Sequence, residues 1–158
     1  MFVHVNNNPN FQENQTSRPI IGVKYVSDVD IIQQAHRGEW YDLRAAKTVT
    51  LKKGESALIP LGVKIQLPVG FEAILSPRSG TYKKYYVIQT NSIGVIDNQY
   101  RGEWLWSVYA TEDTEIPKNE RVCQFRVLPI QPSFEIVEFD ELDETERGDG
   151  SFGSSGRV

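Results

Sequence analysis

Short apolar or alternating stretches, each ended by a turn signal, are the feature of this sequence that most restricts its fold. Glycine, proline or asparagine interrupts the chain at residues 52–55, 60–62, 68–70, 101–103 and 117–120. Most of the intervals are close to the ~8–12 residues expected of strands in a sandwich or barrel. The pattern therefore predicts an all-β fold.

Individual runs support this prediction. Residues 63–67 alternate strictly between apolar and polar, and residues 134–139 alternate apart from a doubled centre. Each run predicts a half-buried strand. An apolar strand is also expected over residues 71–75. Helical periodicity is weak, so we expect only a short helix over residues 79–86 and a turn or two over residues 29–35.

The length of 158 residues, with 39% hydrophobic residues, predicts one domain with tails. Residues 1–19, rich in Asn and Gln, are expected to form an extended or mobile N-terminal arm. The β domain is expected over residues 20–140, beginning near Gly22. Residues 141–158 are expected to form a flexible C-terminal arm, although a plain linker needs neither Arg147 nor the aromatic ring of Phe152.

Composition excludes several classes of protein. The net charge of −4 comes with no basic stretch, so no nucleic-acid polymer is expected as a partner. Apolar runs fall far short of the ~20 residues that cross a membrane. The single cysteine, Cys123, excludes an intrachain disulfide and a thiolate-rich zinc site. We expect an intracellular, cytoplasmic protein, in the host compartment if a virus or phage encodes it.

Two segments carry residues suited to chemistry. Arg78, Ser79 and Gly80 follow a strand and open the expected helix, where backbone N–H groups and side chains suit a phosphate oxygen. An ordinary helix cap remains the alternative. Residues 91–102 suit a β-hairpin pocket in which Asp97 orients and deprotonates a water. A turn with locally satisfied side chains is the alternative there.

A third segment, residues 121–125, alternates along a strand. Alternation predicts Arg121 and Cys123 on one face and Val122 and Gln124 on the other. A lone Arg on a strand usually faces solvent. The amide of Gln124 lies among apolar residues and needs a partner, which a water or a substrate phosphate would supply.

With these motifs in order, the chain resembles the trimeric dUTPase family over about residues 22–158. The counterparts of the five family motifs are residues 41–46, 77–80, 91–102, 121–124 and 147–156. The resemblance implies a dUTPase-like jelly roll or distorted β-barrel and a homotrimer with C-terminal arm exchange. It implies Mg²⁺-dependent hydrolysis of dUTP to dUMP and pyrophosphate, which lowers dUTP and supplies dUMP for thymidylate synthesis.

The resemblance also implies roles for individual residues. Asp97 is the general base, and Tyr100 packs beneath the deoxyribose where a 2′-hydroxyl would clash. The phosphates are held by Arg78, Ser79 and Gly80, with Gln124 and Asp42 supporting them or the waters of the magnesium ion. Uracil is read by Asn91 and by the backbone of Gly94, Val95 and Ile96. The tail closes the site with Arg147, Gly153 and Ser154 near the γ-phosphate and Phe152 on the base.

Two other functions fit parts of the sequence. A dCTP deaminase shares the fold, but it needs a carboxylate beside the pyrimidine. The strand after the third motif, residues 104–109, contains no acidic residue, and the first one to follow is Glu112. A nucleotide-dependent regulator that binds an unknown protein partner is the other alternative, with the N-terminal arm as its candidate surface.

Two positions depart from the family pattern. Trp40, preceded by Glu39, stands where the family usually has a small residue before the aromatic of the first motif. Ser151 stands where a glycine is common in the tail.

Overall fold

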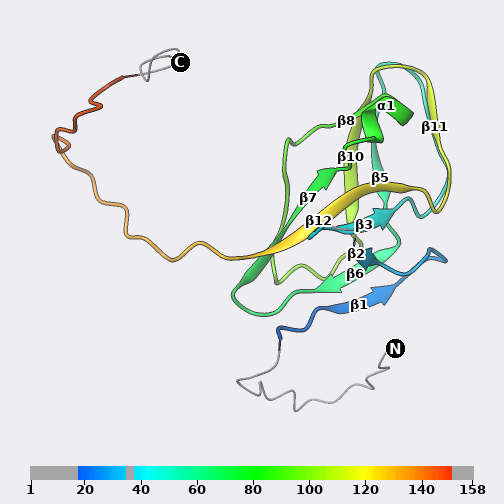
Figure 1. The fold of residues 1–158 in the computed structure, drawn as a ribbon, viewed down its shortest axis with the longest axis horizontal. Helices are drawn as coiled ribbons and strands as arrows, with labels where there is room; N and C mark the ends of the chain where they lie inside the picture. Colours follow the sequence, from blue (N-terminus) through cyan, green and yellow to red (C-terminus); the bar gives the residue numbers. More distant parts are fainter. Residues whose placement is uncertain (1–17, 35–37, 151–158) are drawn as a thin grey trace.

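Short β-strands account for almost all the regular structure of the computed structural model, which describes residues 18–34 and 38–150 (Figure 1). The all-β prediction is confirmed. The strands are β1 (Gly22–Tyr25), β2 (Gln33–Gln34), β3 (Tyr41–Arg44), β4 (Val49–Leu51), β5 (Ser56–Pro60), β6 (Val63–Gln66), β7 (Phe71–Pro77), β8 (Val87–Gln89), β9 (Gly94–Ile96), β10 (Leu105–Ala110), β11 (Thr114–Ile116) and β12 (Arg121–Pro129). One helix, α1 (Thr81–Tyr85), occurs among the described residues and lies inside the predicted range 79–86.

The largest sheet has five antiparallel strands in the order β2-β3-β12-β7-β9. Its centre is the long strand β12, which pairs with β3 on one side and with β7 on the other (Figure 1). Gln124 of β12 lies opposite Asp42 of β3 and Ser76 of β7. This register brings three polar residues from distant parts of the chain into one row across the sheet.

A single cluster of buried apolar side chains joins this sheet to the smaller sheets β5-β10-β8, β4-β11 and β1-β6. Phe125 of β12 lies near its middle. The ring of Trp104 meets Phe125 edge-on at 5.1 Å between centroids, and Tyr41 stacks on Phe125 at 5.3 Å. These aromatic contacts fix β12 against the core, and β12 in turn carries two of the polar residues of the site.

The predicted alternation holds in one strand and fails in another. Val63–Gln66 alternates between buried and exposed side chains. In β12 the register shifts between Arg121 and Cys123, so Val122 and Cys123 are buried in succession. A β-bulge inserts one extra residue and re-aims the side chains around it. The prediction that Arg121 and Cys123 share a face is therefore wrong.

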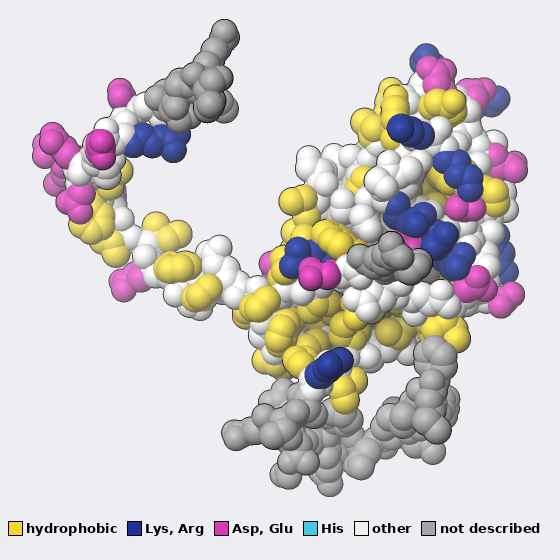
Figure 2. Space-filling view, viewed as in Figure 1, with side chains coloured by type: hydrophobic (Ala, Val, Ile, Leu, Met, Phe, Trp, Pro, Cys, Tyr) yellow, Lys and Arg dark blue, Asp and Glu magenta, His cyan; other side chains and the backbone are white. Residues whose placement is uncertain are grey.

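Residues 134–139 form no strand, and all their side chains are exposed, with Ile136 at 97%. They belong to a segment that leads away from the body after β12, with apolar side chains along it (Figures 1 and 2). The prediction of a half-buried strand is wrong for the single chain, because no described residue of that chain pairs with this segment.

The N-terminal part of the described chain differs less from expectation. β1 begins at Gly22, where the folded domain is predicted to start. The prediction of a helical turn over residues 29–35 is wrong over the part that the structure describes, because Gln33–Gln34 forms β2 and pairs with β3. Within the described part of the chain, no helix is long and apolar enough to cross a membrane.

The buried position of Cys123 gives a direct test of this part of the fold. Burial raises the pKa of the Cys123 thiol well above its ordinary value, and the nearby charge of Asp42 adds to the shift. Since only the thiolate is nucleophilic, the native protein should not react with the thiol reagent DTNB at about pH 8. Protein unfolded in guanidinium should release one equivalent of thionitrobenzoate. Rapid reaction of the native protein would mean that the start of β12 opens readily.

Candidate active site

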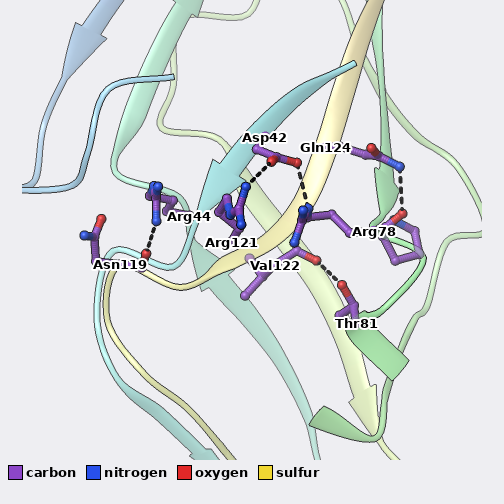
Figure 3. Close-up of polar contacts among 9 residues, drawn as sticks. Asp42, Arg44, Arg78, Thr81, Asn119, Arg121, Val122 and Gln124 are labelled. Atoms are coloured by element: carbon purple, nitrogen blue, oxygen red, sulfur yellow. Dashed lines mark hydrogen bonds and ion pairs between the residues drawn. The ribbon is translucent and has the colours of Figure 1, made fainter. Parts of the chain in front are cut away.

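A buried carboxylate lies at the centre of the polar row. Asp42 of β3 has a side chain only 5% exposed, and it forms ion pairs with two arginines. Arg78 approaches Oδ1 through Nε at 2.7 Å, and Arg121 approaches Oδ2 through Nη1 at 3.3 Å (Figure 3). Asp42 thus links the end of β7 to the start of β12, and it fixes the position of both guanidinium groups.

Two further hydrogen bonds hold the surrounding backbone. The amide of Gln124 donates to the backbone carbonyl of Pro77 at 3.2 Å, and the hydroxyl of Thr81 donates to the carbonyl of Val122 at 2.7 Å (Figure 3). Val122 is the extra residue of the bulge, so Thr81 satisfies a carbonyl that the ladder leaves open. Both bonds tie the segment around Arg78 to β12.

Ser79 and Gly80 lie between β7 and α1, and both are exposed. Gly80 occupies the N-cap position without a side-chain cap, and a Cβ added there would meet no atom within 4 Å. The side-chain helix cap, which was the alternative to phosphate binding, is thus missing here. The open backbone beside Arg78 matches the phosphate-binding prediction, which stays a prediction.

Asp97 lies in a second part of the molecule, at a cavity of about 230 Å³. The lining residues are Val95, Ile96, Asp97, Tyr100, Trp104 and Leu105. Four of these six belong to the predicted third motif. The cavity therefore combines an exposed carboxylate with an aromatic ring and apolar walls, as expected of a pocket for a base and its sugar.

The ring of Tyr100 is held in place by its neighbours. Its hydroxyl donates to the carbonyl of Glu103 at 3.0 Å, and its backbone N–H donates to the carbonyl of Asp97 at 3.1 Å. A Cβ added to Gly102 would overlap the hydroxyl and ring of Tyr100. A glycine at position 102 is therefore required for this placement of the ring.

The third motif does not fold as a simple hairpin. β9 pairs with β7 in the five-stranded sheet, whereas the following strand β10 pairs with β5 and β8. The hairpin prediction is wrong because the chain changes sheet between Asp97 and Leu105. Gly94 explains the choice of partner, since its Cα lies so close to β7 that an added Cβ would be 3.0 Å from Cβ of Leu75.

The two parts of the site lie at opposite ends of β7. Ile96 is opposite Ala73, near the start of β7, while Arg78 follows its last residue. Five residues of strand separate Ala73 from Arg78, which corresponds to about 17 Å at ~3.4 Å per residue. A general base must be within hydrogen-bond reach of its water. Asp97 and Arg78 of one chain therefore lie toward opposite ends of β7.

The described residues contain no group of three or more His, Cys, Asp or Glu side chains arranged to hold a metal ion. Both oxygens of Asp42 already accept from guanidinium groups. Mg²⁺ needs no such cage, because it commonly keeps several waters and binds through substrate phosphates. The side chains around Asp42 are therefore compatible with a Mg²⁺ ion that arrives bound to a nucleotide.

Comparisons with known proteins agree with this geometry. The family model described as dUTPase matches residues 28–156. The chain belongs to the dUTPase family. Among curated relatives of this dUTPase-family chain, the SPbeta prophage-derived deoxyuridine 5'-triphosphate nucleotidohydrolase YosS of Bacillus subtilis (strain 168) is 46% identical over 140 residues, 86% of this chain and 97% of the relative. The deoxyuridine 5'-triphosphate nucleotidohydrolase of Neorickettsia sennetsu is 38% identical over 148 residues, 90% of this chain and 98% of the relative.

Solved structures agree as well. The dUTPase of Staphylococcus bacteriophage 80alpha with dUPNHPP matches with a TM-score of 0.75 and 26% identity, covering 87% of this chain and 99% of that chain. The all-β, dUTPase-like fold is thus confirmed.

Most predicted site residues of this dUTPase-family chain are described. Asn91 is exposed at the turn before β9. Arg147 follows β12 in the segment that leads away from the body in Figure 1, and its Nε donates to the carbonyl of Gly150 at 3.2 Å. Phe152, Gly153 and Ser154 lie outside the described residues.

One departure from the family pattern has a structural partner. The guanidinium of Arg126 lies over the ring of Trp40, 5.7 Å from its centroid. Arg126 and Glu39 also line a cavity of about 300 Å³ beside β1, which contains none of the predicted site residues. Trp40 therefore packs against a residue of the central strand β12.

Sequence reasoning missed Gln89. Its amide nitrogen donates to the carbonyls of Leu75 and Ser92 at 3.1 and 3.2 Å, and its oxygen accepts from Nε1 of Trp106 at 2.7 Å. Gln89 thereby holds the turn before β9 against β7. The sequence signal that could have identified Gln89 is a side-chain amide beside apolar residues, the same signal that singled out Gln124.

Replacing Gly102 with Ala should weaken nucleotide binding. The added methyl displaces the Tyr100 ring into the cavity, so we expect the Kd for dUMP to rise about tenfold or more, a loss of ~1.4 kcal/mol. Isothermal titration calorimetry measures this Kd. Gly22→Ala is the matched control, because its Cβ would meet Cβ of Gln66 at an ordinary 3.5 Å. Equal affinities of the two variants would contradict the assigned position of Tyr100.

Proposed function

We propose that this chain hydrolyses dUTP to dUMP and pyrophosphate as a homotrimer, in active sites formed between subunits. The observation that carries the proposal is the division of the site, with Asp97 and its cavity at one end of β7 and the arginine pair at the other. Relatives whose length the chain nearly spans are named deoxyuridine 5'-triphosphate nucleotidohydrolases.

The cavity accounts for the choice of base and sugar. Asn91 offers the donor and acceptor that a uracil edge requires, and the backbone of Gly94, Val95 and Ile96 completes the recognition. The fixed ring of Tyr100 packs beneath the deoxyribose and excludes a 2′-hydroxyl. Specificity thus rests on a pocket that is already shaped before the nucleotide binds.

The reaction needs no covalent enzyme intermediate. Asp97 takes a proton from a water whose oxygen forms a bond to the α-phosphorus, and the bond to the bridging oxygen breaks to release pyrophosphate. Arg78, Ser79, Gly80 and Gln124 hold and orient the phosphates. A bound Mg²⁺ ion neutralises charge on the phosphate oxygens. The ion would be held mainly by the triphosphate and waters, with Asp42 supporting those waters.

A trimer supplies what the single chain lacks. The outer face of the sheet β5-β10-β8 exposes Leu58, Ile88, Leu105 and Tyr109, with Leu58 at 61%. Among the described strands, β1 pairs only with β6, which leaves its other edge open. Contiguous apolar surface and an open edge are typical of interfaces between chains.

The C-terminal segment supports arm exchange. Phe134, Ile136 and Phe139 are at least 68% exposed, and the alternation of this stretch fits a strand added to another subunit. We assign residues 20–140 to the subunit body, residues 1–19 to an N-terminal arm and residues 141–158 to a tail that closes a neighbour's site. In the closed state Arg147, Gly153 and Ser154 meet the γ-phosphate, and Phe152 covers the base.

A mixing experiment tests the shared site. Asp97→Asn and Arg78→Gln should each be nearly inactive, with losses of ~10²–10⁴ for the general base. When the two chains are unfolded together and refolded in equal amounts, about a quarter of wild-type activity should return, because one neighbouring pair in four combines an intact base with an intact arginine. Pyrophosphate release measures the recovery.

The control is the same mixture without unfolding, in which the homotrimers do not exchange. Absence of recovery in refolded trimers that native mass spectrometry shows to be mixed would mean that Asp97 and Arg78 of one chain serve the same site.

Replacing Tyr100 with Ala should relax the choice of sugar. Without the ring, a 2′-hydroxyl meets no steric barrier, so the ratio of kcat/KM for dUTP to that for UTP should fall by about tenfold or more, equivalent to ~1.4 kcal/mol. Tyr100→Phe keeps the ring and should retain most of the discrimination. An unchanged ratio in the Ala variant would remove Tyr100 from sugar selection.

A further inference from the structure

The side chain of Gln89 joins two sheets of the molecule. Gln89 is the last residue of β8, which belongs to the sheet β5-β10-β8. Its amide nitrogen donates to the carbonyl of Leu75 in β7 at 3.1 Å and to the carbonyl of Ser92, just before β9, at 3.2 Å. Its amide oxygen accepts from Nε1 of Trp106 in β10 at 2.7 Å. One side chain therefore connects the turn between β8 and β9 to strands of both sheets.

Trp106 fixes the direction in which this amide points. An indole N–H can only donate, so it must face the oxygen of the Gln89 amide. The amide nitrogen then faces the two carbonyls, and each of its two N–H groups has one acceptor. A rotation of the amide by half a turn would lose all three hydrogen bonds. Trp106 is fully buried and Gln89 is half-buried, so water competes little with these bonds.

The turn that Gln89 holds has little other support. Ser92 has a φ of 50°, in the left-handed region that residues other than glycine occupy at a cost. Asn91, Ser92 and Ile93 are all exposed, so burial does not hold them in place. The N–H of Ile93 donates to the carbonyl of Asn91, a bond inside the turn. Within residues 18–34 and 38–150, Gln89 is the one side chain that donates to residues 91–93.

The same turn leads directly into the backbone at the Asp97 cavity. Gly94, the first residue of β9, lies opposite Leu75 in the register of β7 and β9. Gln89 thus bonds to the strand residue that faces Gly94 and to the residue two positions before it. Val95 and Ile96, which follow, line the cavity. The position of these backbone groups therefore depends on the place where the amide fastens the turn.

We propose that Gln89 is the positioning residue for base selection, because it holds Asn91 and the backbone from Gly94 onward in the arrangement that accepts uracil and rejects cytosine. The inference rests on the proposed dUTP hydrolysis and adds to it a residue that acts through the turn. Uracil has a carbonyl oxygen where cytosine has an amino group, so the two bases require opposite partners at that position. A turn that is free to move would adapt to either base.

A purely structural role for Gln89 leads to a different expectation. Loss of a bond that only supports the fold lowers stability, and it lowers activity on every nucleotide by the same factor. Loss of a positioning bond lowers activity on dUTP more than activity on dCTP. The ratio of kcat/KM for these two substrates therefore distinguishes the two roles.

Gln89→Leu removes all three hydrogen bonds while keeping a side chain of similar size. The ratio of kcat/KM for dUTP to that for dCTP should fall by about tenfold or more, because rejection of the wrong base depends on hydrogen-bonding groups held in place. Pyrophosphate release measures both activities. Thr90→Val is the matched control, since it removes the exposed hydrogen bond to Ser107 beside the same turn without affecting the bond to Ser92. Its ratio should equal that of the wild type.

Gln89→Glu tests the donors of the amide separately. The carboxylate still accepts from Trp106, but it has no hydrogen to donate to Leu75 or Ser92. Selectivity should therefore be lost at about pH 8 and return in part at about pH 5, where a carboxyl group facing two carbonyls gains a proton and donates. Dividing by the wild-type ratio at each pH removes the effect of nucleotide titration.

An unchanged dUTP/dCTP ratio in folded Gln89→Leu, with or without equal losses on both substrates, would overturn the role of Gln89 in base selection. Should that variant not fold, as judged by native mass spectrometry, wild-type selectivity of Gln89→Glu at about pH 8 would overturn it instead, since its carboxylate cannot donate. Failure of the wild-type protein to release pyrophosphate from dUTP would instead remove the proposed function itself.

Discussion

The ion pairs of Asp42 are the interaction on which the arrangement of the site depends. A buried carboxylate without a partner is costly, and removing one partner from such a pair costs about 3–5 kcal/mol. Here the carboxylate of β3 is satisfied by a residue after β7 and by the first residue of β12. The same contacts that remove the cost of burial therefore set the spacing of two cations at the surface.

Sequence motifs predicted the Asp97 pocket better than they predicted the arginine cluster. Asp97 and Tyr100 lie within one short stretch, so local spacing is enough to bring them to one cavity. Arg121 depends on a bulge, and alternation of residue types cannot reveal an inserted residue. Its partner Asp42 is 79 residues away in the chain, so only the register of β3 and β12 brings the two together.

The exposed segment after β12 illustrates a different limit. Alternation in residues 134–139 predicts a strand, but it carries no information about which chain would provide the neighbouring strand. A single chain leaves these side chains in water. The strand prediction fails for the isolated subunit because no described residue of that chain pairs with this segment or buries it. The strands predicted over residues 63–67 and 71–75 were found as β6 and β7, whose partners lie in the same chain.

The separation of Asp97 from Arg78 along β7 has a consequence for how damage spreads through a trimer. In the homotrimer proposed above, each copy would supply the proton acceptor to one catalytic centre and the cations to the next. In that assembly, a copy that had lost both functions would silence two centres out of three, although its two companions are sound. Such a copy would act as a dominant inhibitor when produced beside the intact protein.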